Sequence, residues 1–458
     1  MRGAAGTDAG TSVGGRQAAR VGPVGSPGGG DDRNAQRDGH GAVGTNWAGS
    51  HTYRASRIVR PRSVEELAEV VAGSSAVRAL GSRHSFSDLP DTLGTLVDLA
   101  LLPADVRVEE GGAGIPATVS VGGGTRYGDL ARALEERGWA LAAMASLPHI
   151  SVAGAVATGT HGSGNRIGSL AAAVRALEVM GPDGAVRRVA RGEPDFAGSV
   201  VALGALGVVT RLELDVEPSY EVSQEVRTGL TWPVLESRFD EITAAAYSVS
   251  VFTRFGAAVD QLWLKHREGE ARPTDLFGTA AAQAPLHMVL GGSDDALTDQ
   301  GGVAGPWLDR LPHFRMAFTP SVGAELQSEY FLPRDEALEA IARLRSLAPH
   351  FAPLLQVAEF RTIAADDLWL SAAHGRDTVA LHFTWLRDEV AVRRAVRDVE
   401  QALVPLGARP HWGKVFEMDA AALTAAFPRL RDFARLRDRL DPERVFGNAF
   451  LDRVLGEG

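Results

Sequence analysis

Apolar positions along the first half of the chain predict short strands that alternate with helices. Ser63-Val-Glu-Glu66 has the form of a capping box, and apolar residues then follow at helical spacing. The runs AVRAL (76–80) and TLVDL (95–99) predict strands. The stretch ATVSVGGGTRYGDLARALEERG (117–138) predicts a strand, a glycine-rich turn and an amphipathic helix.

The same type of pattern continues to about residue 218. Gly181-Pro-Asp-Gly184 separates the apolar runs 174–180 and 185–189, so we expect a β-hairpin there. Residues 201–218 end in an alternation of apolar and polar positions that is typical of a half-buried strand. Together these elements predict an α+β domain.

From about residue 219 the pattern changes. Residues 268–306 are rich in Gly, Ala, Pro and Asp and predict a long loop region. Strands are predicted at LLQVAEFRTI (354–363) and DTVALHFTW (377–385), and helices at 336–347 and 392–403. These elements indicate a second α+β domain.

Length and composition agree with two domains and exclude several classes of function. A chain of 458 residues is too long for one ordinary hydrophobic core. The net charge of −10 argues against nucleic acid or an anionic membrane as a partner. The chain has no cysteine, which excludes disulfides, thiolate metal sites and a cysteine nucleophile. No apolar run approaches the ~18 residues that a transmembrane helix needs.

The first 45 residues differ from the rest. They contain no Leu, Ile, Phe, Tyr or Trp, and they lack the apolar segment of a secretory signal. Such a segment cannot bury enough apolar surface to fold. We expect residues 1–45 to be a disordered tail, and the folded part to start near Asn46.

The run LPHISVAGAVATGTHGSG (147–164) consists mostly of small residues. Small residues let the backbone approach a ligand closely, and free N–H groups in such loops can bind a pyrophosphate. The spacing of Gly159, Gly162 and Gly164 does not fit the G-x-G-x-x-G fingerprint, which disfavours a Rossmann dehydrogenase. From composition alone, a tightly packed turn without a ligand remains an alternative.

Two other kinds of site are disfavoured. The histidines 149, 161, 382 and 411 lack metal-type spacing, so we expect no metal site. GTHGSG does not fit the G-x-S-x-G nucleophile elbow.

Four segments of the first half resemble the FAD-binding domain of the vanillyl-alcohol-oxidase flavoprotein superfamily: ALGSRHSF (79–86), SVGGGTRYGDL (120–130), 147–164 and LGALGVVT (203–210). Within it, residues 46–458 are most similar to the alditol oxidases. The segments that carry this similarity are NWAG (46–49), 144–164, AELQSEY (324–330) and ARPHWGKVF (408–416).

The resemblance implies FAD as cofactor. It implies that His84, in the loop GSRHSF, carries FAD through a covalent bond to the flavin 8α-methyl group. The second, cysteinyl linkage of some relatives is excluded by the lack of cysteine. Arg83 stands where family members have glycine. The cofactor-binding residues implied by the match are Leu80, Gly81, Ser82, Arg83, His84, Ser85, Ser146, Ser151, Gly154, Thr158, Gly159, Thr160, His161, Val209 and His411.

Two polar pairs interrupt the apolar strands of the second half. Glu359 and Arg361 are two residues apart, as are His382 and Thr384, so each pair shares one face of its strand. A buried charge is costly unless it is paired, which favours one shared polar cavity. The pattern alone leaves open that this face points to solvent.

The resemblance favours the cavity, because the matching residues line the polyol site of alditol oxidases. It implies the substrate-binding residues Ser146, Glu359, Arg361, His382, Thr384 and Lys414, of which Glu359, Arg361, His382 and Lys414 are the catalytic candidates. Arg361 and Lys414 are cations suited to a developing alkoxide or to the negative charge on the N1–C2=O edge of the reduced flavin. His382, oriented by Glu359, is the candidate base.

We therefore expect a two-domain α+β flavoprotein. A PCMH-type FAD-binding domain comprises residues 46–218 and 411–458, and a substrate-binding cap domain comprises residues 219–410. The expected reaction is FAD-dependent oxidation of the C1 hydroxyl of an alditol, such as xylitol or sorbitol, with O2 reduced to H2O2. An aldonolactone oxidase or dehydrogenase is the alternative, and a FAD-binding protein without turnover is another. We expect a cytoplasmic monomer with no nucleic-acid or membrane partner.

Overall fold

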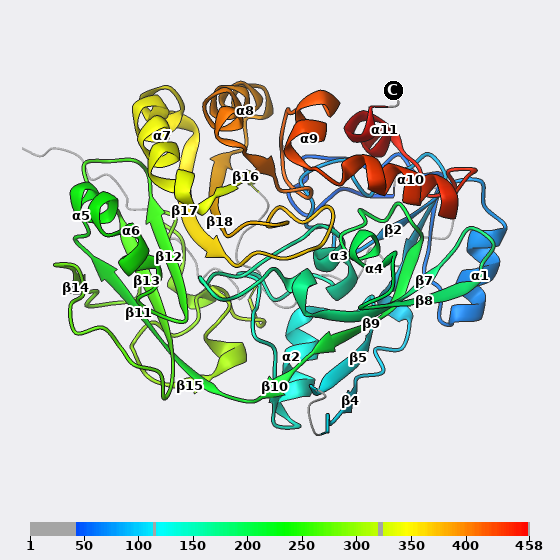
Figure 1. The fold of residues 1–458 in the computed structure, drawn as a ribbon, viewed down its shortest axis with the longest axis horizontal. Coiled ribbons are helices and arrows are strands. Elements are labelled where there is room, and N and C mark those ends of the chain that lie inside the picture. The colour runs from blue at the N-terminus through cyan, green and yellow to red at the C-terminus, as the bar shows by residue number, and fades with distance from the viewer. Residues whose placement is uncertain (1–42, 113–115, 319–323, 457–458) are drawn as a thin grey trace, which may run out of the picture. The chain divides into compact units, whose positions relative to one another are not determined.

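The computed structural model describes residues 43–112, 116–318 and 324–456. The predicted disordered tail, residues 1–45, lies outside these ranges except for its last three residues. Figure 1 shows the helices and strands of the described chain.

Two sheets form in the first half of the chain. A five-stranded antiparallel sheet has the order β4-β5-β9-β7-β8, and a three-stranded parallel sheet has the order β1-β3-β2. The strands are β1 (Arg57–Val59), β2 (Val77–Leu80), β3 (Thr95–Asp98), β4 (Arg107–Glu109), β5 (Thr118–Gly122), β7 (Val174–Met180), β8 (Val186–Ala190) and β9 (Val208–Asp215), with a separate pair β6 (Trp139–Ala140) and β10 (Glu217–Pro218). The predicted strands and the 174–189 hairpin are confirmed.

Helix α1 (Val64–Ala72) begins at the predicted capping box. The Ser63 hydroxyl accepts a hydrogen bond from the Glu66 N–H at 3.2 Å. The Glu66 carboxylate accepts from the N–H of Arg62, at 2.7 Å, instead of from that of Ser63. The first bond of the capping box is confirmed, and the second is displaced by one residue.

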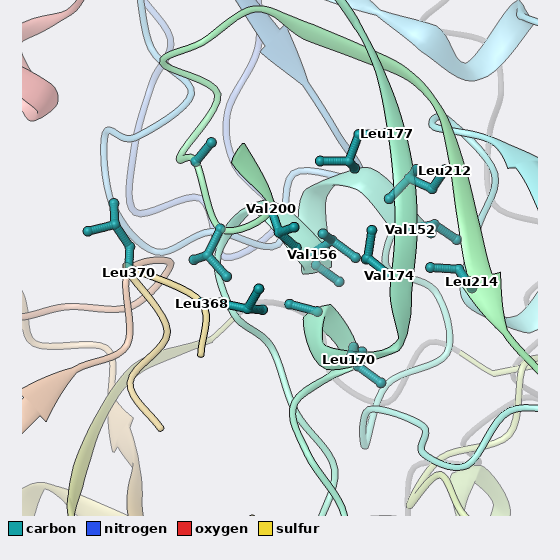
Figure 2. Packing of buried hydrophobic residues seen from close by; sticks show 14 of the residues in the cluster. Val152, Val156, Leu170, Val174, Leu177, Val200, Leu212, Leu214, Leu368 and Leu370 are labelled. Atoms are coloured by element: carbon teal, nitrogen blue, oxygen red, sulfur yellow. The ribbon is translucent and has the colours of Figure 1, made fainter. Parts of the chain in front are cut away.

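Helices α2 (Tyr127–Glu135), α3 (Val152–Ala157) and α4 (Phe196–Ser199) complete this half. Val152 and Val156 of α3 belong to the same buried cluster as Leu177 of β7 and Leu212 of β9, and Figure 2 shows them packed together. This packing fixes the glycine-rich run that contains α3 against the five-stranded sheet.

A nine-stranded antiparallel sheet dominates the second half. Its order is β14-β11-β13-β12-β17-β18-β16-β19, with β15 paired to β11. The strands are β11 (Glu221–Thr228), β12 (Ser248–Thr253), β13 (Gln261–Arg267), β14 (Ala280–Ala281), β15 (Gly305–Pro306), β16 (Glu325–Pro333), β17 (Leu355–Ile363), β18 (Thr378–Leu386) and β19 (Arg409–Pro410). The two predicted strands, β17 and β18, are confirmed.

Helices α5 (Trp232–Ser237), α6 (Phe239–Thr243), α7 (Ala337–Phe351) and α8 (Glu389–Leu403) accompany this sheet. Leu344 of α7 and Val396 of α8 share a core cluster with Leu381 and Phe383 of β18. Side chains alternate along a strand, so the residues between these apolar positions lie on the opposite face of the sheet. That face carries the predicted polar pairs.

The C-terminal helices are α9 (Ala420–Ala426), α10 (Leu430–Leu440) and α11 (Ala449–Leu455). Phe433 of α10 and Leu451 of α11 belong to the same core cluster as Val119 of β5. The C-terminal segment therefore packs with the first half of the chain. None of the helices in the described ranges is long and apolar enough to cross a membrane. The predicted α+β fold is confirmed.

Candidate active site

Three neighbouring strands bring the predicted polar pairs together. Glu329 of β16, His382 of β18 and Glu359 of β17 occupy directly opposed positions across the sheet. Glu359 is 4% exposed and His382 8%, and Arg361 and Thr384 are equally buried. The interpretation in which this face points to solvent is therefore wrong.

Glu329 lies at the centre of this face, although it was not among the predicted site residues. Its buried carboxylate accepts hydrogen bonds from Arg361 Nη2 and Lys414 Nζ, each at 2.7 Å, and lies 3.1 Å from His161 Nε2. Burial raises the pKa of Glu329, but Lys414, His161 and Arg361 together hold it well below its ordinary value. We call Glu329, Glu359, Arg361 and Lys414 the charge cluster.

Glu359 has a different partner from the one expected. Its Oε1 lies 2.9 Å from His313 Nε2, and its Oε2 lies 3.4 Å from Arg361 Nε. Burial raises the pKa of Glu359, but Arg361 and His313 bring it below its ordinary value. Glu359 is therefore ionised at neutral pH and can accept a hydrogen bond from a hydroxyl group.

His382 is oriented by Gln327 instead of by Glu359. Its Nε2 lies 3.1 Å from Gln327 Oε1, and the Gln327 amide nitrogen donates to Glu325 at 2.7 Å. Because an amide oxygen only accepts, Nε2 carries the hydrogen and Nδ1 has a lone pair. Burial and the nearby Lys414 lower the pKa of His382 to about 3. The ring is therefore neutral at pH 7 and offers the Nδ1 lone pair as a hydrogen-bond acceptor.

The remaining predicted substrate residues border the charge cluster. Ser146 Oγ lies 3.4 Å from Arg361 Nη1. Thr384 lies opposite Gln327 in the register of β16 and β18. The ring of His411, also a predicted cofactor residue, stacks on Phe331 with centroids 6.0 Å apart.

The predicted cofactor loop follows β2, whose last residue, Leu80, is buried. Among the described residues, no acceptor pairs with the backbone N–H groups of residues 82–85. The Ser82 hydroxyl accepts from the Ser151 N–H at 3.1 Å, which ties the loop to the start of α3. Free N–H groups in a glycine-started loop suit a pyrophosphate, so this loop fits FAD.

Glycines allow close backbone packing around this loop. A Cβ added to Gly81 or Gly154 would lie 2.6 or 2.7 Å from Ser151 Oγ. A Cβ added to Gly123 would lie 2.4 Å from the carbonyl oxygen of Val209. The close backbone approach that a dinucleotide needs is thus part of the fold. We call residues 80–85 and 151–160, together with Gly123 and Val209, the glycine cradle.

The end of the cradle leads into the charge cluster. Gly159 has φ 68°, a left-handed conformation that favours glycine. The hydroxyls of Thr158 and Thr160 lie 3.3 Å apart. The next residue, His161, was predicted to contact the cofactor, and its ring lies against Glu329. One short segment therefore joins the two regions.

His84 lies in the cofactor loop with its ring 5.2 Å from that of Trp47. Within the described chain, neither ring nitrogen has a hydrogen-bond partner. Burial, with His149 and Arg126 nearby, lowers the pKa of His84 to about 4. A neutral imidazole with an available lone pair is the form that can bond to a flavin carbon.

Arg83 directs its side chain away from the cradle. Its φ is 63°, in the region that favours glycine. Its guanidinium donates to the carbonyl of Val43 at 3.1 Å and lies over the ring of Tyr53. Any contact of Arg83 with the cofactor in this arrangement is made by its backbone.

The loop of His84 contacts the loop of Lys414 directly. The Phe86 N–H donates to the carbonyl of Gly413 at 2.7 Å, and the Ser85 hydroxyl donates to the same carbonyl at 3.2 Å. His84, the predicted tether, and Lys414 of the charge cluster therefore lie on two loops that are hydrogen-bonded to each other.

A crevice of about 10 Å³ reaches Ser146, His313 and Arg361, which is room for about one water molecule. Beside it lies a cleft of about 870 Å³ between the two halves of the described chain. The crevice and the cleft share the lining residues Ala142, Ala143, Ile167 and Tyr247.

Comparison with known proteins decides the family. An alditol oxidase of Streptomyces sp. is 50% identical over 415 residues, which cover 90% of this chain and 98% of that protein. The chain belongs to the alditol oxidase family of FAD flavoproteins. Residues 55–190 match a FAD binding domain family, and residues 323–454 match the D-arabinono-1,4-lactone oxidase family. The protein is therefore an FAD-dependent oxidoreductase.

More distant relatives place this family in a wider group. An L-gulono-1,4-lactone dehydrogenase of Mycobacterium tuberculosis is 31% identical over 441 residues, covering 90% of this chain and 99% of that protein. The crystal structure of cholesterol oxidase from B. sterolicum superposes with a TM-score of 0.73 at 15% identity, over 95% of this chain and 100% of that one. At that identity the likeness concerns the fold alone, and it agrees with the predicted FAD-binding and cap architecture.

Proposed function

We propose that the protein oxidises the C1 primary hydroxyl of an alditol, with xylitol and sorbitol as first candidates, to the aldose, and that O2 is reduced to H2O2. The observation that carries this proposal is the buried charge cluster beside Ser146 and His382. It offers several donors and acceptors in one enclosed place. A site that pairs many hydroxyls rejects analogues that lack them.

We propose FAD as the cofactor, covalently attached through His84. The free N–H groups of residues 82–85 and the tight glycines support the binding of its pyrophosphate. When bound, FAD supplies the hydride acceptor and passes the electron pair to O2. Residues 46–218 and 411–458 are proposed to hold the cofactor, and residues 219–410 to bind the substrate.

The residues of the charge cluster then have distinct roles. Glu359 accepts a hydrogen bond from a substrate hydroxyl, and Ser146 and Thr384 position the terminal hydroxyls. Arg361 and Lys414 stabilise the negative charge that develops on the substrate oxygen. Each is already bonded to Glu329, which holds it in place before substrate arrives.

His382 is the proposed general base. The hydroxyl proton moves to Nδ1, because Nε2 is engaged with Gln327. As the proton leaves oxygen, C1 loses a hydride and becomes the aldehyde carbon of the aldose. O2 finally takes up two electrons and two protons to give H2O2.

An anaerobic mixing experiment tests the proposal. Holoenzyme mixed with xylitol or sorbitol should lose its flavin absorption near the visible maximum, and admission of air should restore the colour with one H2O2 per polyol. Lys414→Met should slow the bleaching at least tenfold while FAD stays bound. No bleaching with any polyol would contradict the proposed function.

A sugar lactone is the second candidate substrate, because a relative is an L-gulono-1,4-lactone dehydrogenase and residues 323–454 match a lactone oxidase family. Bleaching by L-gulono-1,4-lactone but not by xylitol would favour that reaction.

The covalent bond has its own test. Acid precipitation of the wild type should give a yellow pellet, whereas His84→Ala should release FAD into the supernatant. A colourless wild-type pellet would contradict the tether.

We also propose that the protein is a cytoplasmic monomer whose partners are its polyol and O2. Light scattering on the holoenzyme should give a mass near 48.4 kDa plus FAD. A mass twice that value would contradict the monomer.

A further inference from the structure

Lysine is almost absent from this chain. Of its 47 Lys and Arg residues, only Lys265 and Lys414 are lysines. Lys414 belongs to the charge cluster. Lys265 lies on β13, outside the motifs of both predicted sites, and is 1% exposed. In a chain that otherwise uses arginine as its cation, a buried lysine at this position calls for a specific reason.

The contacts of Lys265 supply one. Its Nζ donates to the carbonyls of Arg310 at 2.9 Å, Leu311 at 2.5 Å and Pro312 at 3.1 Å, and it lies 3.2 Å from His313 Nδ1. A compact ammonium can share its three N–H groups among the three carbonyls and the ring nitrogen, whereas the planar fork of arginine cannot. Lys265 therefore holds the turn 310–313 at its centre.

This turn touches the proposed polyol site at two points. The backbone N–H groups of His313 and Phe314 donate to the carbonyl of Ser146, at 3.0 and 3.2 Å. The His313 ring reaches Glu359 Oε1 at 2.9 Å. One buried lysine side chain thus supports the backbone of Ser146 and the carboxylate of Glu359, two residues proposed to bind the substrate.

We propose that Lys265 and His313 are positioning residues, which act through Ser146 and Glu359 to set the geometry of the polyol site. This inference rests on the proposed function, because it assigns what the two positioned residues bind. Neither Lys265 nor His313 needs to touch the substrate or the cofactor.

The tautomer of His313 follows from its two neighbours. Glu359 is an ionised acceptor, so Nε2 must carry the hydrogen, and Nδ1 then offers its lone pair to the Lys265 N–H. Burial and the charge of Lys265 lower the pKa of His313 to about 4, which keeps the ring neutral at pH 7. The ring then links Lys265 to Oε1 of Glu359, and Oε2 of Glu359 stays beside Arg361.

The two lysines provide a direct test. Holoenzyme labelled with ¹³Cε-lysine should give two side-chain NMR signals, assigned with Lys265→Met and Lys414→Met. The flavin is reduced beforehand with dithionite, so that xylitol binds without turnover. We expect both signals to shift with the same binding curve. A shift of Lys414 alone would overturn the inference, and a shift of neither would instead reject xylitol as the ligand.

A measurement without any substrate separates the inference from the proposed function. In ¹⁵N-histidine-labelled holoenzyme, with His313→Gln used for assignment, His313 should be the neutral Nε2–H tautomer at pH 7. Lys265→Met should raise the pH at which this ring titrates. A His313 ring with hydrogen on Nδ1 alone, or one insensitive to Lys265→Met, would overturn the inference whether or not polyols are substrates.

Steady-state kinetics complete the test. Losing a hydrogen bond to a charged group should raise KM for xylitol about tenfold or more in His313→Leu, with a smaller change in kcat. His313→Gln keeps a donor and should recover part of the loss. The double variant Lys265→Met/His313→Leu should be no worse than the worse single variant. If Lys265→Met does not fold, the comparison of His313→Leu with His313→Gln still tests the inference. Equal KM values for these two variants would contradict the positioning role.

Discussion

The glycine cradle and the charge cluster are joined by one short segment but are built by opposite means. The cradle offers backbone N–H groups and an absence of side chains, as at Gly81, Gly123 and Gly154. The charge cluster offers charged side chains from β16, β17 and the loop after β19, each paired with another. Adding one carbon should therefore damage the glycine cradle, whereas removing one charge should damage the charge cluster.

Glu329→Ala should have the largest effect, because it leaves Arg361 and Lys414 without their shared carboxylate. Removing one partner of a buried ion pair costs about 3–5 kcal/mol of unfolding free energy. Urea unfolding of the holoenzyme measures it. Exposed Glu443→Ala is the control and should change stability by less than about 0.5 kcal/mol. Equal stability of the two variants would show that the cluster is not held by Glu329.

Gly123→Ala should come next and should act on the cradle. The added Cβ would meet the Val209 carbonyl at 2.4 Å, and overpacking of this kind costs about 1–3 kcal/mol. We expect lower stability and less FAD per chain, measured from the flavin absorbance. Gly256→Ala is the matched control, because a Cβ there meets nothing within 4 Å. Full FAD content in Gly123→Ala would show that the Val209 carbonyl can move away from the added Cβ without loss of cofactor binding.

The cradle was predictable from sequence because its information is local. A glycine-started loop after a strand and a run of small residues identify it, and the residues named there lie together in the structure. His161 is the exception, since its ring turns to Glu329.

The charge cluster was only half predictable. Glu359, Arg361, His382 and Lys414 do meet, but Glu329, Gln327 and His313 were missed. Their strand and turn show no apolar pattern that marks them as buried. β11, β13 and β16 were missed for the same reason: Gln224, Lys265 and Glu329 are buried polar residues whose partners come from distant parts of the chain. Burial of such residues depends on tertiary contacts that no local period reports.

Acid should destabilise the protein through the buried histidines beside the charge cluster, because burial keeps their rings neutral in the folded chain. The pKa values of His382 and His313 are lowered from 6.5 to about 3 and about 4. Below pH 6.5 the unfolded chain therefore binds protons that the folded chain does not. Stability is complete above that pH and is lost as the pH falls toward 4, by up to about 1.4 kcal/mol per pH unit for each ring.

Melting temperatures between pH 8 and pH 4.5 measure this effect. The charges facing His382 are Lys414, Glu329, Glu359 and Arg361. His382→Phe keeps a ring of similar size but cannot be protonated. It should melt lower than the wild type at pH 8 and should show a flatter decline toward acid. Parallel curves for the two proteins would show that His382 does not contribute to the pH dependence of stability.

Arg83→Gly should have the smallest effect, since two consequences oppose each other. Glycine removes the strain of φ 63°, but the hydrogen bond to Val43 is lost. We expect a net change within about 1 kcal/mol and unchanged covalent FAD, measured by thermal unfolding and by the colour of the acid pellet. A colourless pellet would show that the Arg83 side chain is needed for attachment.

The scarcity of lysine gives this protein an unusual chemical property. Both ε-amines are engaged, Lys265 with a turn and Lys414 with Glu329, so reagents that acylate amines should leave these two side chains untouched until the chain opens. A lysine-specific protease likewise has only these two cleavage positions. Labelling or cleavage at either would then report, without any engineered probe, when the part of the molecule around that lysine unfolds.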